Sequence, residues 1–138
     1  MERIIGIDYG VKRVGIAISD PLCIFASPLE TIQTTKIIDY LKNYAYSEGI
    51  KMFVVGYPKK LNNAISETTK RVDNFIAMLK RAFPYTPILT EDERLTTIIA
   101  QKALIDGGMK KSDRAQKGSA DKVSAALILQ SYLDRVNR

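Results

Sequence analysis

The chain has 138 residues, of which 46% are hydrophobic and 26% are charged, a balance typical of a globular domain with a buried core. It contains no histidine, which excludes Ser-His-Asp triads, histidine general bases and histidine-ligated zinc. Its single cysteine, Cys23, excludes an internal disulfide and is expected to be a core thiol. Any catalysis must therefore use carboxylates, lysines, hydroxyls or a metal ion.

The formal charge is +6, which suits a polyanionic partner but also occurs in proteins that bind none. No apolar run is long enough to cross a bilayer. Asp8 and Gly10 interrupt the one stretch that resembles a secretory signal. We therefore expect a cytoplasmic protein without a membrane partner.

Three strands are expected in the first part of the chain. Residues 3–8 and 12–18 are rich in Ile and Val, and the three residues between them are few enough for an antiparallel hairpin. A third strand is expected within residues 22–33. Pro21 and Pro28 would place that strand at an edge of the sheet, because proline has no backbone N–H to donate to a neighbouring strand.

The hydrophobic period then changes to that of alternating helices and strands. Helices are expected at residues 35–48, 65–82, 95–106 and from Ser119, as N-cap, to Val136. Short strands are expected at residues 51–55 and 87–90. Right-handed crossovers would make these two strands parallel to the first. The sequence thus predicts an α/β fold with a mixed five-stranded sheet flanked by helices, in a single domain over residues 1–138.

Carboxylates follow the strands whose C-terminal ends should share one edge of this sheet, where open α/β sheets usually bind ligands. Asp8 ends the first strand, and the run Glu91, Asp92 and Glu93 ends the last. Asp121 lies near the start of the final helix, on a packed side that could face the same edge.

Three carboxylates at one edge would repel one another by about 4 kcal/mol per pair, at roughly 4 Å and an effective dielectric near 20. A cation would offset this repulsion. Oxygen ligands without histidine suit Mg²⁺ or Mn²⁺, and paired ions about 3.5–4 Å apart are common in displacement at phosphorus.

Other interpretations of these residues stay open from pattern alone. Asp8 before Gly10 could be a turn residue, and Asp121 could favour the helix dipole. The acidic run at 91–93 and the basic loop at 110–117 could be ordinary solvated surface. Basic side chains that could contact a phosphate backbone are Lys12, Arg13, Arg94, Lys110, Lys111, Arg114, Lys117 and Lys122.

Four motifs resemble one known family. The stretches GIDYGVKRVGIAISDP, VVGYP, TEDERLTT and SADKVSAALILQSYL, in this order, span almost the whole chain. Together they resemble the YqgF family, also called RuvX, whose members are described as Holliday junction resolvases and as nucleases of pre-16S rRNA. The resemblance implies an RNase H-like fold and a cytoplasmic nuclease.

The resemblance also assigns residues. It implies that Asp8, Glu93 and Asp121 are the catalytic residues and ligands of Mg²⁺ or Mn²⁺, and it selects Glu93 from the acidic run. Asp20 and Asp92 are expected to support the site. Related junction resolvases use four acidic residues, whereas the final motif here holds one aspartate, which leaves open whether one or two ions bind. After VVGYP this chain has KKLNNAIS, where relatives more often have a glycine-containing loop.

The implied function is that of a metal-dependent endonuclease that hydrolyses phosphodiester bonds at the 5′ end of precursor 16S rRNA during ribosome biogenesis. One alternative is a Holliday junction resolvase-like DNA endonuclease of recombination and repair, with branched DNA as partner. Another is a non-catalytic module that binds nucleic acid or ribosomal particles. A nucleotide-hydrolysing enzyme of the actin and sugar-kinase type would need a second lobe. Both a monomer and a weak homodimer are compatible with the sequence.

Overall fold

The computed structural model describes residues 2–58, 67–92 and 119–137. In this part of the chain a five-stranded sheet has the strand order β3-β2-β1-β4-β5. β1 and β2 are antiparallel, as are β2 and β3, whereas β1, β4 and β5 run parallel to one another. The expected mixed sheet is thereby confirmed. The strands are β1 (Arg3–Asp8), β2 (Arg13–Ser19), β3 (Ala26–Gln33), β4 (Ile50–Tyr57) and β5 (Ile88–Asp92).

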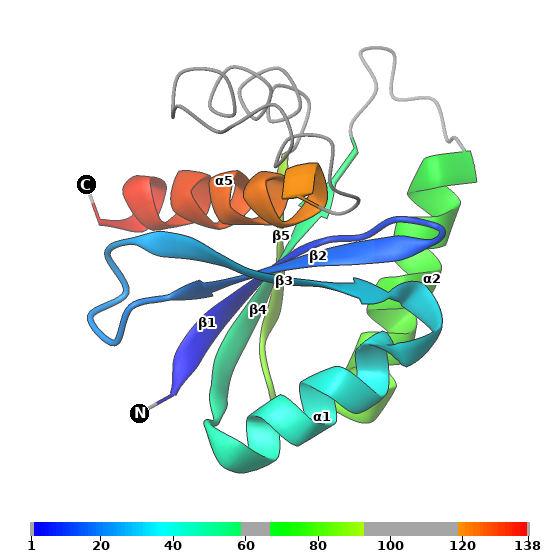
Figure 1. Cartoon of the computed structure of the whole chain (residues 1–138), viewed down its shortest axis with the longest axis horizontal. Helices are drawn as coiled ribbons and strands as arrows, with labels where there is room; N and C mark the ends of the chain where they lie inside the picture. Colours follow the sequence, from blue (N-terminus) through cyan, green and yellow to red (C-terminus); the bar gives the residue numbers. More distant parts are fainter. Residues whose placement is uncertain (1, 59–66, 93–118, 138) are drawn as a thin grey trace.

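Helices cover both faces of the sheet (Figure 1). α1 (Ile37–Ser47) and α2 (Glu67–Ala82) lie on one face, and α5 (Ser119–Val136) lies on the other. The helix expected from residue 35 begins later, because the tighter 3₁₀ turn η1 (Thr34–Lys36) precedes it. The helix expected at 95–106 and the basic loop at 110–117 lie outside the described residues. None of the helices that the structure describes is long and apolar enough to span a membrane.

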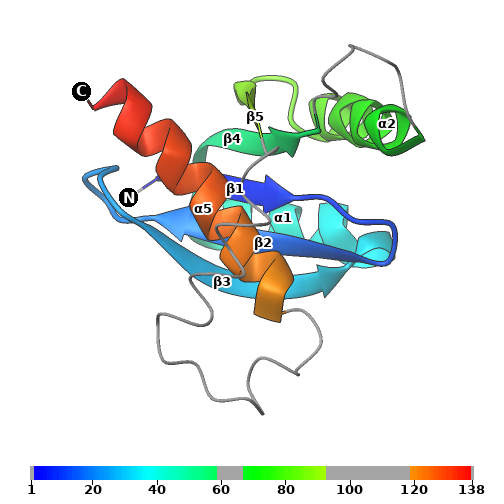
Figure 2. The same ribbon diagram turned by 90° about the horizontal axis from the view of Figure 1, so that it is seen from above.

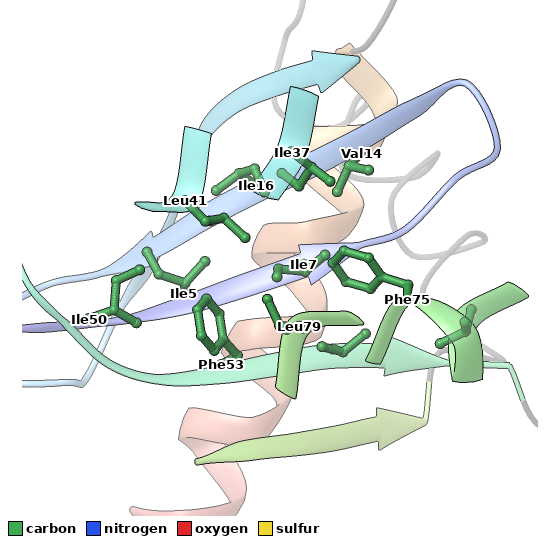
Figure 3. Close-up of a cluster of buried hydrophobic side chains, with 12 residues drawn as sticks. Ile5, Ile7, Val14, Ile16, Ile37, Leu41, Ile50, Phe53, Phe75 and Leu79 are labelled. Atoms are coloured by element: carbon green, nitrogen blue, oxygen red, sulfur yellow. The ribbon is translucent and has the colours of Figure 1, made fainter. Parts of the chain in front are cut away.

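The larger core lies between the sheet and the helices α1 and α2 (Figure 3). Alternate residues of β1, Ile5 and Ile7, point into this core, because successive side chains of a strand face opposite sides. Leu41 of α1 and Phe75 of α2 meet them from the helical layer. The remaining buried members are Val14, Ile16, Ile37, Ile50, Phe53, Val55, Val72 and Leu79.

The smaller core lies between the sheet and α5. Ile4, Ala17 and Val54 of the sheet pack against the alanine and leucine side of the helix. Gly6 lets the helix come close, because an added Cβ would lie 2.7 Å from the Cβ of Leu129. Figure 2 shows α5 crossing the sheet obliquely, in contact with β1, β2 and β3.

The expectation that the third strand lies at an edge is confirmed. Among the strands that the structure describes, β3 pairs with β2 alone. The register jumps from the pair Ile16 and Glu30 to the pair Ala17 and Pro28, which leaves Leu29 as an extra residue on β3. A bulge of this kind accommodates proline at the edge of a sheet.

The turn between β2 and β3 is held by Asp20. Its Oδ1 accepts hydrogen bonds from the backbone N–H groups of Ile24 (2.7 Å) and Phe25 (2.8 Å). These bonds, chiefly the one from Phe25, hold the pKa of Asp20 below its ordinary value of 3.8. Cys23 lies in this turn with a positive φ of 58° and is half-buried against the α5 core. The thiol expected in the core is therefore at its margin.

Candidate active site

Asp8 and Asp121 come to the same end of the same face of the sheet. Asp8 is the last residue of β1 and pairs with Gly15 of β2. Because side chains alternate along β1, Asp8 shares the α5 face with Ile4 and Gly6. The first turn of α5 lies directly on Gly15, where an added Cβ would stand 2.0 Å from the carbonyl oxygen of Asp121. Gly15 is therefore in contact with both residues: it pairs with Asp8 in the sheet, and the backbone of Asp121 packs on it.

Sequence reasoning missed this role of Gly15, although a signal was present. A single glycine inside the Ile- and Val-rich strand RVGIAIS is typical of a close backbone approach. The partner that approaches could not be read from the sequence, because α5 lies more than 100 residues further along the chain.

Arg13 binds Asp121 directly. Its Nε donates to Oδ2 of Asp121 at 3.1 Å, between side chains that are 42% and 33% exposed. Arg13 was expected to contact phosphate. That contact stays a prediction; in the structure the guanidinium is paired with Asp121, a predicted metal ligand.

The structure separates the members of the acidic run at the end of β5. The side chain of Glu91 is 10% exposed, and its Oε1 accepts a hydrogen bond from Nη2 of Arg135 at 2.8 Å. Arg135 in turn lies 5.4 Å from the ring centre of Tyr132. Glu91 therefore ties β5 to the end of α5. Asp92 ends β5, half-buried and paired in register with Tyr57, whereas Glu93 lies outside the described residues.

Asp20 is not brought to Asp8 and Asp121. The antiparallel register pairs Ile5 with Ile18, so the chain leaves β2 at the opposite end of the sheet from Asp8. Asp20 lies five positions after Gly15, which corresponds to about 16 Å along an extended strand. Its observed hydrogen bonds are those of the turn, and we leave it out of the proposed site.

Two of the predicted phosphate contacts other than Arg13 lie in the described part of the chain. Lys12 is exposed in the turn between β1 and β2, and Lys122 is half-buried beside Asp121. Thr34 fixes the turn: its N–H donates to the carbonyl of Lys12 at 3.0 Å, and its hydroxyl donates to the carbonyl of Gly10 at 2.7 Å. The remaining predicted contacts lie outside the described residues: Arg94, Lys110, Lys111, Arg114 and Lys117.

Helix α2 holds the strand ends from the other face of the sheet. Tyr9, directly after Asp8, stacks on Phe75 with ring centres 4.7 Å apart. The hydroxyl of Tyr57 donates to Oδ1 of Asp73 at 2.9 Å. Burial, followed by this bond, raises the pKa of Tyr57. Sequence reasoning missed both contacts, which fix the chain next to Asp8 and at the end of β4.

The carboxylates fit a hard divalent cation. Asp8 and Asp121 supply oxygen ligands of the kind that Mg²⁺ and Mn²⁺ prefer. Within residues 2–58, 67–92 and 119–137 no group of three acidic or other ligating side chains forms. The third expected ligand, Glu93, lies outside these ranges.

Comparison with known proteins identifies the family. A family profile described as "RuvX: Holliday junction resolvase" matches residues 2–135. The chain belongs to the RuvX family. The resemblance of the four sequence motifs is thereby confirmed.

Relatives of the RuvX family match nearly the whole chain. A protein of Bacteroides fragilis is 42% identical over 134 residues, which cover 97% of each chain, and a protein of Parabacteroides distasonis is 45% identical over 97% of this chain and 96% of its own. Both are named "Putative pre-16S rRNA nuclease".

Two solved structures confirm the RNase H-like fold. The Fowlpox virus resolvase, in complex with Holliday junction DNA, has a TM-score of 0.64 at 13% identity and covers 99% of both chains. RuvC of Thermus thermophilus, also with a Holliday junction, has a TM-score of 0.59 at 16% identity and covers 99% of this chain and 96% of its own. At these identities the likeness concerns the fold alone.

Proposed function

We propose that this RuvX-family chain is a metal-dependent endonuclease that hydrolyses phosphodiester bonds at the 5′ end of precursor 16S rRNA, in the cytoplasm, during ribosome biogenesis. The observation that carries the proposal is the approach of Asp121 to Asp8 at Gly15. Gly15 pairs with Asp8 and carries the backbone of Asp121, so two acidic residues distant in sequence lie at the same end of one sheet face, where a family with nuclease relatives would place its site.

In the proposed mechanism Asp8, Asp121 and Glu93 hold Mg²⁺ or Mn²⁺. When bound there, such an ion would supply Lewis acidity for displacement at phosphorus and would lower the pKa of a bound water. Lys12 and Lys122 attract the phosphate backbone beside the carboxylates, together with the basic residues of segment 94–117. Tyr9 and Phe75 hold the chain that carries Asp8, so that its carboxylate keeps one position during the reaction.

The relatives favour RNA as the substrate. Those that match nearly the whole chain at 42% and 45% identity are named for pre-16S rRNA, whereas the structures named for Holliday junctions support the fold alone. Cleavage of one RNA strand needs one site, so a monomer over residues 1–138, acting as a single domain, is sufficient. Paired cuts in a symmetric DNA junction would need a homodimer.

Replacement of Asp8 by asparagine tests the proposal. Asp8→Asn removes one anionic ligand without changing side-chain size, so Mg²⁺- or Mn²⁺-dependent cleavage should fall on the order of 100-fold or more. Cleavage is measured side by side on a pre-16S rRNA fragment, an unrelated single-stranded RNA and a four-way DNA junction. Circular dichroism checks that the fold is retained.

Asp39→Asn is the matched control, because it makes the same change on an exposed residue of α1, on the other face of the sheet. This variant should cleave as well as the unmodified protein. Retained cleavage by Asp8→Asn would contradict the assignment of the site. Preferential cleavage of the junction would indicate that the substrate is DNA. Binding without cleavage of any substrate would indicate a binding module.

A further inference from the structure

A cation of the protein already neutralises one of the carboxylates. Arg13 is the first residue of β2, and its Nε donates to Oδ2 of Asp121 at 3.1 Å. Gly15, two residues later on the same strand face, carries the backbone of Asp121. One short stretch of β2 therefore positions Asp121 and also binds its side chain.

The ion pair between Arg13 and Asp121 is accessible to ions from the solvent. Both side chains are partly exposed, at 42% for Arg13 and 33% for Asp121, so neither partner is trapped in the core. An ion pair with this exposure contributes little to stability and opens at low cost. An incoming cation can therefore displace the guanidinium without unfolding the helix.

We propose that Arg13 competes with the metal ion for Asp121. The guanidinium of Arg13 binds the carboxylate until a divalent cation replaces it, and it is then released toward the phosphate of the substrate. This inference rests on the proposed metal site of the nuclease. A ligand oxygen that accepts from Arg13 is less available to a metal, and a fixed positive charge nearby repels a second one.

The proposal implies a coupling between metal and nucleic acid. A phosphate that binds Arg13 removes the competitor from Asp121 and so favours the metal. By linkage, the metal favours phosphate binding by the same factor. Arg13 would then keep metal occupancy low in the absence of substrate.

Equilibrium binding of Mn²⁺ to the full chain, measured by calorimetry without nucleic acid, tests the proposal. Arg13→Gln keeps a hydrogen-bond donor but removes the charge, and it should bind Mn²⁺ about three- to tenfold more tightly than the unmodified protein. Arg13→Lys keeps the charge and should stay within about twofold. Lys122→Gln is the matched control, since it removes a positive charge beside Asp121, and its gain should be about twofold or less.

The outcomes separate this inference from the proposed function. Unchanged or weaker Mn²⁺ binding by Arg13→Gln would overturn the competition and leave the metal site standing. An equal gain in Lys122→Gln would overturn it as well, because the effect would then be one of overall charge. If neither the unmodified protein nor Arg13→Gln binds Mn²⁺, the proposed metal site itself fails. In the Asp121→Asn background, Arg13→Gln should give no gain, and a gain there would also contradict the proposal.

Discussion

Glu91 and Glu93 are two residues apart in one acidic run, yet the structure gives Glu91 a separate task. Its carboxylate is nearly buried and bound to Arg135 of α5. The sequence alone made the two residues equally good candidates for a metal ligand, because the residues around Glu91 do not reveal its partner 44 positions away. Glu91 is thereby accounted for as the tie between β5 and α5, and Glu93 stays the predicted ligand.

A pair of substitutions tests this division. Glu91→Gln should keep Mn²⁺-dependent cleavage within a few-fold of the unmodified protein, whereas Glu93→Gln should lose it. Arg135→Met should lower the free energy of unfolding by about 1–2 kcal/mol, because it leaves the carboxylate of Glu91 nearly buried without this partner. The estimate is kept low because Arg135 is 55% exposed.

Urea denaturation measures the free energy of unfolding, and the cleavage assay measures Mn²⁺-dependent activity. The double variant Glu91→Gln with Arg135→Met should regain part of the lost stability, since it removes the unpaired charge. Loss of cleavage by Glu91→Gln, with the fold intact, would show that Glu91 rather than Glu93 serves the site.

At the scale of elements, α5 depends on the absence of side chains beneath it. An added Cβ at Gly15 would stand 2.0 Å from a backbone oxygen, and one at Gly6 would stand 2.7 Å from the side chain of Leu129. A side chain can shift more easily than the helix backbone. The first turn of α5, which carries Asp121, is therefore the more sensitive of the two contacts.

Alanine at these two positions gives a comparison within one helix. Gly15→Ala and Gly6→Ala should each destabilise the protein by about 1–3 kcal/mol in urea denaturation, through overpacking against α5. Gly15→Ala should also weaken Mn²⁺ binding strongly, because it moves Asp121 away from Asp8. Equal Mn²⁺ affinities in the two variants would contradict the role assigned to Gly15.

Most elements were predictable because their signals are local. Runs rich in Ile and Val identified β1 and β2, and Pro28 correctly indicated an edge strand. The start of β3 was not predictable, because the hydrogen bonds of Asp20 hold residues 20–25 in a turn within the segment 22–33. For the site, strand order placed Asp8 correctly at the edge, whereas the pairing of Arg13 with Asp121 joins residues 108 apart.

For the molecule as a whole, the two faces of the sheet differ. Two helices close one face over a large apolar core, and in the described part of the chain α5 alone crosses the other (Figure 1). Asp8 and Asp121 lie at one end of the α5 face, together with the basic residues Lys12, Arg13 and Lys122. The net charge of +6 thus has a local component next to the site, where a polyanion would use it.

The salt dependence of nucleic-acid binding tests this charge distribution. Lys12→Ala should weaken the binding of single-stranded RNA and lower the slope of log K against log salt by about 0.7, the value for one lost phosphate contact. Lys80→Ala, at the far end of α2, is the control and should leave the slope unchanged. The slopes are measured by fluorescence anisotropy. Equal slopes for both variants would show that Lys12 makes no phosphate contact.

The long separation between Asp8 and Asp121 also sets when the site can exist. During synthesis β1 and β2 leave the ribosome long before α5, and Asp121 cannot reach Gly15 until α5 has been made. A growing chain therefore carries Asp8 without its helical partner. If the chain cleaves RNA as proposed, its own synthesis acts as a delay, and the nascent protein is harmless to the transcripts and ribosomes around it until α5 docks on the sheet.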